Sequence, residues 1–213
     1  MKTDELIASL SDKAVSAPSL PAPARLWILA MALFTAYGAI VVMILGGPRA
    51  DIAGFISHPL IMLEFSLMIA LLGTSLWSSI CYIYPDQYGQ PMITSLPMIL
   101  LALLLATLVI QVDNVDMSGL MAAMPHHVEC LSCIAFATII PATALFILTQ
   151  KGATTTPTHS GCCALLASAS IGCIALRLTE VTSDMMHLLL SHYAPIMLFA
   201  GIGVVLGRAV LKW

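Results

Sequence analysis

The residues best suited to chemistry lie near the middle of the chain, in segment 126–133, which reads HHVECLSC. On a helix, His126 and Cys130 are four residues apart and Cys130 and Cys133 three apart, so an imidazole and two sulfur atoms can face one side. Nitrogen and sulfur donors of this kind suit a soft or borderline metal ion. Alternatively, the cysteines are small buried hydrophobic residues and the histidines satisfy local backbone or lipid headgroups. The pattern indicates a candidate metal site at His126, His127 and Cys130, and packing stays open.

The composition shows what kind of element must carry these residues. The chain has 213 residues, of which 60% are hydrophobic and 9% charged, and its mean hydropathy is +0.99. Because a soluble domain carries about 25% charged residues, most of this chain is expected to lie in a membrane. The net charge of −3 argues against direct nucleic-acid binding, which favours a basic surface.

Six charge-free runs of 21 to 26 residues predict an all-α, polytopic membrane protein. About 20 apolar residues in a helix cross the ~30 Å hydrocarbon layer, so each run can hold one span of a six-helix transmembrane domain, residues 26–213. The fifth span is the weakest prediction, because Thr and His residues occupy the front of its run and leave a short helix rich in Ser, Gly and Cys. The predicted spans are 26–45, 60–83, 92–110, 131–149, 162–178 and 187–210.

The lysine and arginine residues predict the orientation of the bundle. With both termini in the cytoplasm, six of these residues lie inside and only Arg49 and Arg177 lie outside, as the positive-inside rule requires. The segment 126–133 and His187 then fall at the outer face. Cys173 is expected at a depth similar to that of Cys133, so Cys130, Cys133 and Cys173 are also candidates for oxidation outside the cytoplasm.

Residues 1–25 form the one sizeable segment expected outside the membrane. Thr3 can cap a helix with Asp4 and Glu5 in its first turn, where negative charge is favourable. Leu6, Ile7 and Leu10 then share one face, which suits the groove of a cytoplasmic partner. A helix on the bilayer surface or a frayed tail explains the same pattern. A Pro-rich spacer follows the helix.

Several short motifs, in order and over essentially the whole chain, match a known family. They are MKTDELI at 1–7, GPRAD at 47–51, Cys130-Leu131, Pro141 before Lys151-Gly152-Ala153, Pro157, Gly161, and GRAVLKW at 207–213. In these motifs the chain resembles the NrsF family, the negative-regulator-of-sigma-F group of six-span inner-membrane anti-sigma factors.

The resemblance implies an inhibitor rather than an enzyme. It would hold an extracytoplasmic-function sigma factor at the cytoplasmic face of a bacterial inner membrane and release it under oxidative or heavy-metal stress. The implied partners are the sigma factor and membrane lipid, no cofactor is expected beyond the candidate metal, and the natural contact is the N-terminal segment. We assign that contact to Asp4, Glu5, Leu6, Ile7 and Leu10. A small transporter and a haem- or copper-binding membrane redox subunit remain alternatives.

The resemblance also implies a sensor built from two outward-facing cysteines, and here the chain departs from the family. Cys130 matches the first cysteine, but Thr179 stands where the second is expected. Three interpretations remain open. Cys133 or Cys173 substitutes as the partner, Cys130 acts with His126, His127 and His187 on a metal, or sensing has been lost.

Overall fold

The computed structural model describes residues 3, 5, 7, 8, 20–84, 91–111, 124–181 and 184–211, with backbone only at 91, 94 and 124–127. Every regular element in these residues is helical, which confirms the predicted all-α fold. The helices are α2 (Pro23–Ile44), α3 (Ile52–Ile56), α4 (Pro59–Cys81), α5 (Pro91–Ile110), α7 (Met124–Gln150), α8 (Pro157–Thr179), α9 (Met185–Leu188), the π turn η2 (Leu189–Tyr193) and α10 (Ala194–Val210).

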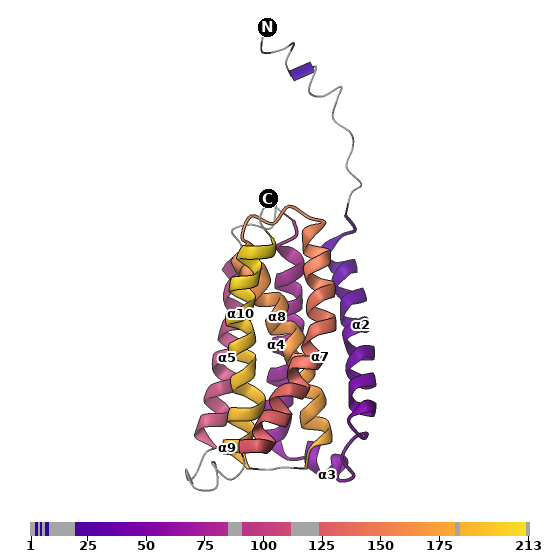
Figure 1. Ribbon diagram of the computed structural model, residues 1–213, viewed down its shortest axis with the longest axis vertical. Helices are drawn as coiled ribbons and strands as arrows, with labels where there is room; N and C mark the ends of the chain where they lie inside the picture. The colour runs from indigo at the N-terminus through magenta and orange to yellow at the C-terminus, as the bar shows by residue number, and fades with distance from the viewer. Residues whose placement is uncertain are drawn as a thin grey trace.

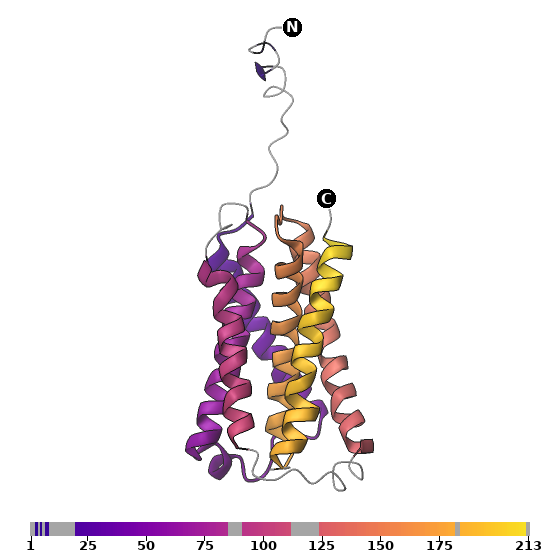
Figure 2. The same cartoon turned by 90° about the vertical axis from the view of Figure 1, so that its left-hand side faces the viewer.

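The long helices run side by side, up and down, in one elongated bundle (Figures 1 and 2). α2 begins and α10 ends at the same end, which we call the terminal end, whereas α3 and α9 lie at the opposite end. Within the described residues, five helical stretches are long and apolar enough to cross a membrane, and α5 adds a shorter apolar stretch, Ser95–Ile110. The predicted count of six spans therefore holds approximately.

The fifth predicted span, the weakest by composition, is the centre of the bundle. α8 begins at Pro157, five residues before the predicted span, because Pro at the first helical position costs no backbone hydrogen bond. In α8, 89% of the apolar stretch is buried, against 17% in α2. Small Ser, Gly, Ala and Cys side chains allow neighbouring helices to approach closely, so the residues that weaken the hydropathy of α8 suit it to the central position.

The closest approach is between α8 and α10. A Cβ placed on Gly203 would lie 2.4 Å from the carbonyl oxygen of Gly161, and one on Gly207 would lie 2.1 Å from that of Pro157. Gly203 and Gly207 are four residues apart and line one face of α10, the spacing typical of closely packed membrane helices. This contact clamps the terminal end of α10 onto the beginning of α8.

Two prolines inside helices leave backbone carbonyls without their usual donors, and a neighbouring helix supplies a hydroxyl to each. Pro141 removes the donor for the carbonyl of Ala137, which accepts a 3.0 Å hydrogen bond from the Tyr37 hydroxyl of α2. Pro97 likewise removes the donor for the carbonyl of Ile93, which accepts a 2.5 Å hydrogen bond from the Ser78 hydroxyl of α4. These hydroxyls fix α2 against α7 and α4 against α5.

Replacing Tyr37 with Phe is expected to lower the free energy of unfolding by about 1–3 kcal/mol, because the Ala137 carbonyl would be left without a partner. Unfolding of the detergent-solubilised protein in SDS, followed by far-ultraviolet circular dichroism, measures the change. Ser66→Ala is the matched control, since the exposed Ser66 hydroxyl bonds only the Met62 carbonyl of its own helix. Equal stability of the two variants would show that the Tyr37 bond is not significant.

Candidate functional site

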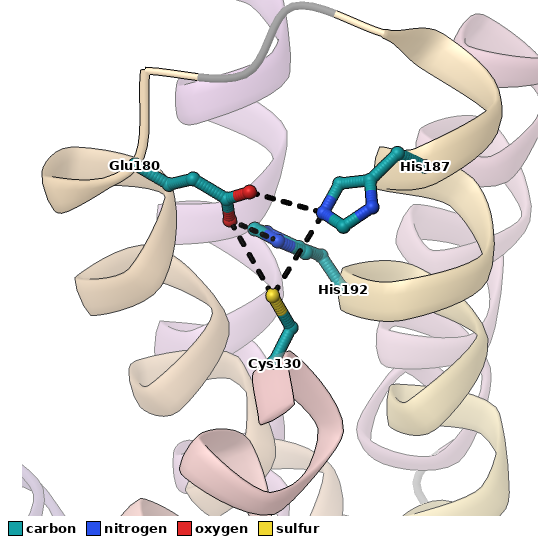
Figure 3. A group of neighbouring side chains, drawn as sticks. All are labelled: Cys130, Glu180, His187 and His192. Carbon is teal, nitrogen blue, oxygen red and sulfur yellow. Dashed lines mark hydrogen bonds and ion pairs between the residues drawn. The ribbon is translucent and has the colours of Figure 1, made fainter. Parts of the chain in front are cut away.

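Four side chains converge at the end of the bundle opposite the terminal end. Cys130 comes from the first turns of α7, Glu180 directly follows α8, His187 belongs to α9 and His192 to η2 (Figure 3). We call these four residues the Cys130 cluster. Their potential ligand atoms all lie within 4.8 Å of one another. Residues up to 62 positions apart in sequence therefore meet in a space the size of a metal coordination sphere.

The Glu180 carboxylate is the centre of the cluster. Its Oε1 lies 3.0 Å from Nε2 of His187 and its Oε2 2.8 Å from Nε2 of His192. The Cys130 thiol donates to Oε2 of Glu180 over 3.7 Å, and its sulfur lies 3.8 Å from Nε2 of His187. The cluster thus joins one thiol, two imidazoles and one carboxylate.

The π turn brings the two histidines together. His187 and His192 are five residues apart, which on a regular α-helix of 3.6 residues per turn separates them by about 140°. The wider π turn reduces that angle, and their ring centroids lie 5.5 Å apart in an edge-on arrangement. Asp184 fixes the start of α9, because its side chain accepts a 3.1 Å hydrogen bond from the Met186 backbone N–H.

The cluster is largely shielded from solvent. Cys130 is 4%, His187 3% and His192 0% exposed, and the Glu180 side chain is 15% exposed. Although Nε2 of His192 lies close to Glu180, neither ring nitrogen of His192 makes a hydrogen bond of acceptable geometry. A buried polar group without such a bond carries a desolvation cost. The Nε2 atom of His192 points into the cluster.

A buried ion pair lies beside the cluster. Arg177 of α8 contacts Glu64 of α4 through two bonds, Nε to Oε1 at 2.8 Å and Nη2 to Oε2 at 3.3 Å. The Tyr193 hydroxyl donates to the same Glu64 carboxylate and also contacts the Met68 sulfur at 3.2 Å. Because Tyr193 follows His192 and Arg177 precedes Glu180 by three residues, the ion pair and the cluster share two backbone segments.

The loop after α2 is fastened to the same region. The Arg49 backbone N–H donates to the Leu178 carbonyl at 3.0 Å, and its Nη1 donates to the Glu180 carbonyl at 3.1 Å. The Arg49 guanidinium also bonds Asp51 and so lowers the pKa of that carboxyl. The Phe55 ring of α3 lies against both Arg49 and Arg177, at 3.8 and 4.7 Å from the guanidinium carbons to the ring centroid. These contacts hold the end of α2 that lies away from the terminal end against the end of α8.

Only some of the site residues predicted from the sequence belong to the Cys130 cluster. Cys130 is in the cluster, and Cys133, one turn further along α7, packs against Cys130, Ile134 and Leu176 without contributing to the cluster. The thiol of Cys173 is fully buried and donates to the His192 carbonyl at 3.3 Å. Within the described residues, all cysteines are free thiols. The side chains of His126 and His127 lie outside the described residues.

The predicted N-terminal contact lies mostly outside the described residues, which exclude Asp4, Leu6 and Leu10. Glu5 and Ile7 are helical and exposed, Ile7 to 60%.

Sequence reasoning placed His187 beside Cys130 as one of three alternatives, but it did not assign Glu180 or His192 to the site. Glu180 immediately follows Thr179, the position where the family cysteine is expected. That proximity was an available signal, because a side chain one residue further along can reach the same space. The π turn that directs His192 into the cluster has no clear signal in the sequence.

Comparison with known protein families matches residues 10–213 to the family described as NrsF, negative regulator of sigma F. No similar protein was found among curated proteins, and no similar structure among solved ones. The match covers all of the helices from α2 to α10 and every residue of the Cys130 cluster. The chain therefore belongs to the NrsF family of negative regulators of sigma F.

Proposed function

We propose that the chain is a membrane-embedded anti-sigma factor that holds an extracytoplasmic-function sigma factor at the cytoplasmic face of a bacterial inner membrane. The observation that carries the proposal is the family match over residues 10–213. The apolar helices supply the membrane anchor. A regulator of this kind acts by binding and release and needs no catalytic group.

The charges at the two ends of the bundle support a cytoplasmic terminal end. Arg25, Lys151 and Arg208 lie at or near the terminal end. At the opposite end, Arg49 and Arg177 are buried and paired with Asp51 and Glu64. Cationic residues in short loops favour the cytoplasm, so this distribution directs the Cys130 cluster outward.

The sigma factor is held by the N-terminal segment in this proposal. The family match begins at residue 10, so the assignment of Asp4, Glu5, Leu6 and Ile7 rests on the amphipathic pattern and on the exposure of Ile7. An amphipathic helix presenting an apolar face is a common way to occupy a groove on a partner. The Pro-rich spacer gives the helix reach beyond the headgroups.

The signal acts at Cys130. A stress reagent that modifies or binds Cys130 would change the contact of α7 with the end of α8 and with η2, which lie in the same cluster. Release requires that the signal favour one of two conformations over the other. Of the three cysteines considered, Cys130 is the one that belongs to the group of possible metal ligands among the described residues, which supports its assignment as the sensor.

Changing Leu6, Ile7 and Leu10 together to Ser is expected to abolish recovery of the sigma factor in a pull-down from solubilised membranes, because the apolar face would be lost. Mass spectrometry identifies the co-purified protein. The matched control changes Ala8 and Asp12, which the sequence pattern predicts on the opposite face of the helix, to Ser and should retain the sigma factor.

Loss of the sigma factor in both variants would place the contact elsewhere. Recovery of no sigma factor by the unchanged, folded and inserted protein would contradict the anti-sigma proposal. Solute flux in vesicles or a haem or copper absorption spectrum would then identify the transporter or the redox subunit.

A further inference from the structure

The Cys130 cluster has the donor number and spacing of a metal site. In a tetrahedral site with ligand distances of 2.0–2.3 Å, neighbouring ligand atoms are about 3.3–3.8 Å apart. Oε2 of Glu180 lies 2.8 Å from Nε2 of His192 and 3.7 Å from Sγ of Cys130, and Nε2 of His187 lies 3.0 Å from Oε1 of Glu180 and 3.8 Å from Sγ of Cys130. With one ligand atom taken from each residue, all four lie within 4.8 Å of one another. The four residues are therefore close enough together to hold one ion.

The donor types select among metals. Ca²⁺ and Mg²⁺ require sets of oxygen ligands, and monovalent copper prefers sulfur ligands. One sulfur, two imidazole nitrogens and one carboxylate oxygen form a mixed set that suits a borderline divalent cation such as Zn²⁺. When Cys130 ionises on binding, the thiolate and the Glu180 carboxylate together balance the charge of a dication. A neutral complex is what a shielded site near the membrane can accept, because an unbalanced buried charge is costly.

The environment of His192 also favours a ligand role. Its side chain is fully buried, and its Nε2 points at the other ligand atoms, 2.8 Å from Oε2 of Glu180 but without a hydrogen bond of acceptable geometry. Coordination through Nε2 would satisfy the nitrogen that faces the cluster.

The other two candidate thiols supply no ligand atom to the Cys130 cluster. The Cys173 thiol is directed to the His192 carbonyl, and Cys133 packs beside Cys130, Ile134 and Leu176. Neither belongs to the cluster. At the position beside the expected second cysteine, the chain instead offers the carboxylate of Glu180.

We propose that Cys130, Glu180, His187 and His192 bind one divalent cation of the Zn²⁺ type. The role of the cation as the signal that acts on Cys130 rests on the proposed function. Binding of the cation to the cluster does not depend on the sigma factor. The cation ties α7 to the end of α8 and to η2, so occupancy changes how firmly these three elements are joined.

Binding is tested on the full-length protein, purified in detergent and freed of metal. Titration with Zn²⁺ against a chromophoric chelator is expected to show one ion per chain. Co²⁺ in place of Zn²⁺ is expected to give the charge-transfer absorption of a cobalt–thiolate bond. Cys130→Ser should remove that absorption, and His192→Gln should weaken Zn²⁺ binding by more than about tenfold, the minimum expected from the loss of a group that only orients a ligand.

Two variants at the terminal end serve as controls, His159→Gln and Cys162→Ser. They remove an imidazole and a thiol outside the cluster and should leave the affinity and the Co²⁺ spectrum unchanged. Circular dichroism establishes that each variant is folded.

Three outcomes would overturn the proposal: no Zn²⁺ binding by the folded protein, binding that persists unchanged in Cys130→Ser, or binding that depends on His126 and His127 instead of His192. None of them bears on the pull-down, which detects the sigma factor without metal. Conversely, Zn²⁺ binding by a chain that captures no sigma factor would support the site and contradict the proposed function.

Discussion

Replacing Arg177 with Met is expected to lower the free energy of unfolding by about 3–5 kcal/mol, because it leaves the Glu64 carboxylate buried without its cation. Glu64 is 2% and Arg177 1% exposed, and two hydrogen bonds join them. Unfolding in SDS mixed micelles, followed by circular dichroism, measures the loss. A second expected sign is a lower apparent affinity of the Cys130 cluster for Zn²⁺, because Arg177 and Glu180 lie on one turn of backbone.

The double variant Glu64→Leu/Arg177→Met is the control for charge. Since neither buried charge remains, it should be more stable than Arg177→Met alone, as is common when both members of a buried pair are replaced by apolar groups. If the single variant lost less than about 1 kcal/mol, the typical upper value for an exposed pair, Glu64 would have to be solvated in the folded protein.

Replacing Gly207 with Ala is expected to destabilise the bundle by about 1–3 kcal/mol, the usual cost of overpacking. The new Cβ would lie 2.1 Å from the Pro157 carbonyl oxygen, a backbone atom that cannot rotate away, so α8 and α10 would have to separate. The same SDS titration measures the change. Loss of this contact also frees the terminal end of α10 from α8.

Gly201→Ala is the matched control, on the same helix. A Cβ at Gly201 meets nothing within 4 Å, so this variant should be neutral or up to about 1 kcal/mol more stable, since Ala favours helix over Gly. Equal destabilisation of both variants would point to a general requirement for glycine in α10 and not to the contact with Pro157.

The all-helical fold was predictable, because charge-free runs of about 20 residues have few alternatives in a membrane. Which helix would be the most deeply buried was not predictable from hydropathy. Hydropathy measures affinity for an apolar solvent, whereas the position of α8 depends on the small size of residues such as Gly161 and Gly172, which meet Gly203 and Ala137 at short range. In α8 the small side chains favour a central position, although the same residues lower its hydropathy and make it the weakest predicted span. Close packing of the small residues determines the position that α8 takes.

The candidate site was predictable only in part. Cys130 and His187 could be assigned to the same face from topology, since the predicted spans place each of them at the same end of the bundle. Their common neighbours Glu180 and His192 depend on a loop conformation and on a π turn, which arise from tertiary contacts. Local periodicity would direct His192 away from His187, so a regular helix is the wrong template for this segment.

The attachment of Arg49 to residues 178 and 180 has a mechanical consequence for α2. This helix has 22 residues and is about 33 Å long at 1.5 Å per residue. It packs less tightly than α8, yet Arg49 fastens its far end to the backbone that carries Glu180, while its near end continues into the N-terminal segment. Because a helix is stiff along its axis, a displacement of the backbone at Glu180 would act through Arg49 on the loop after α2 and, from there, along α2 toward the terminal end.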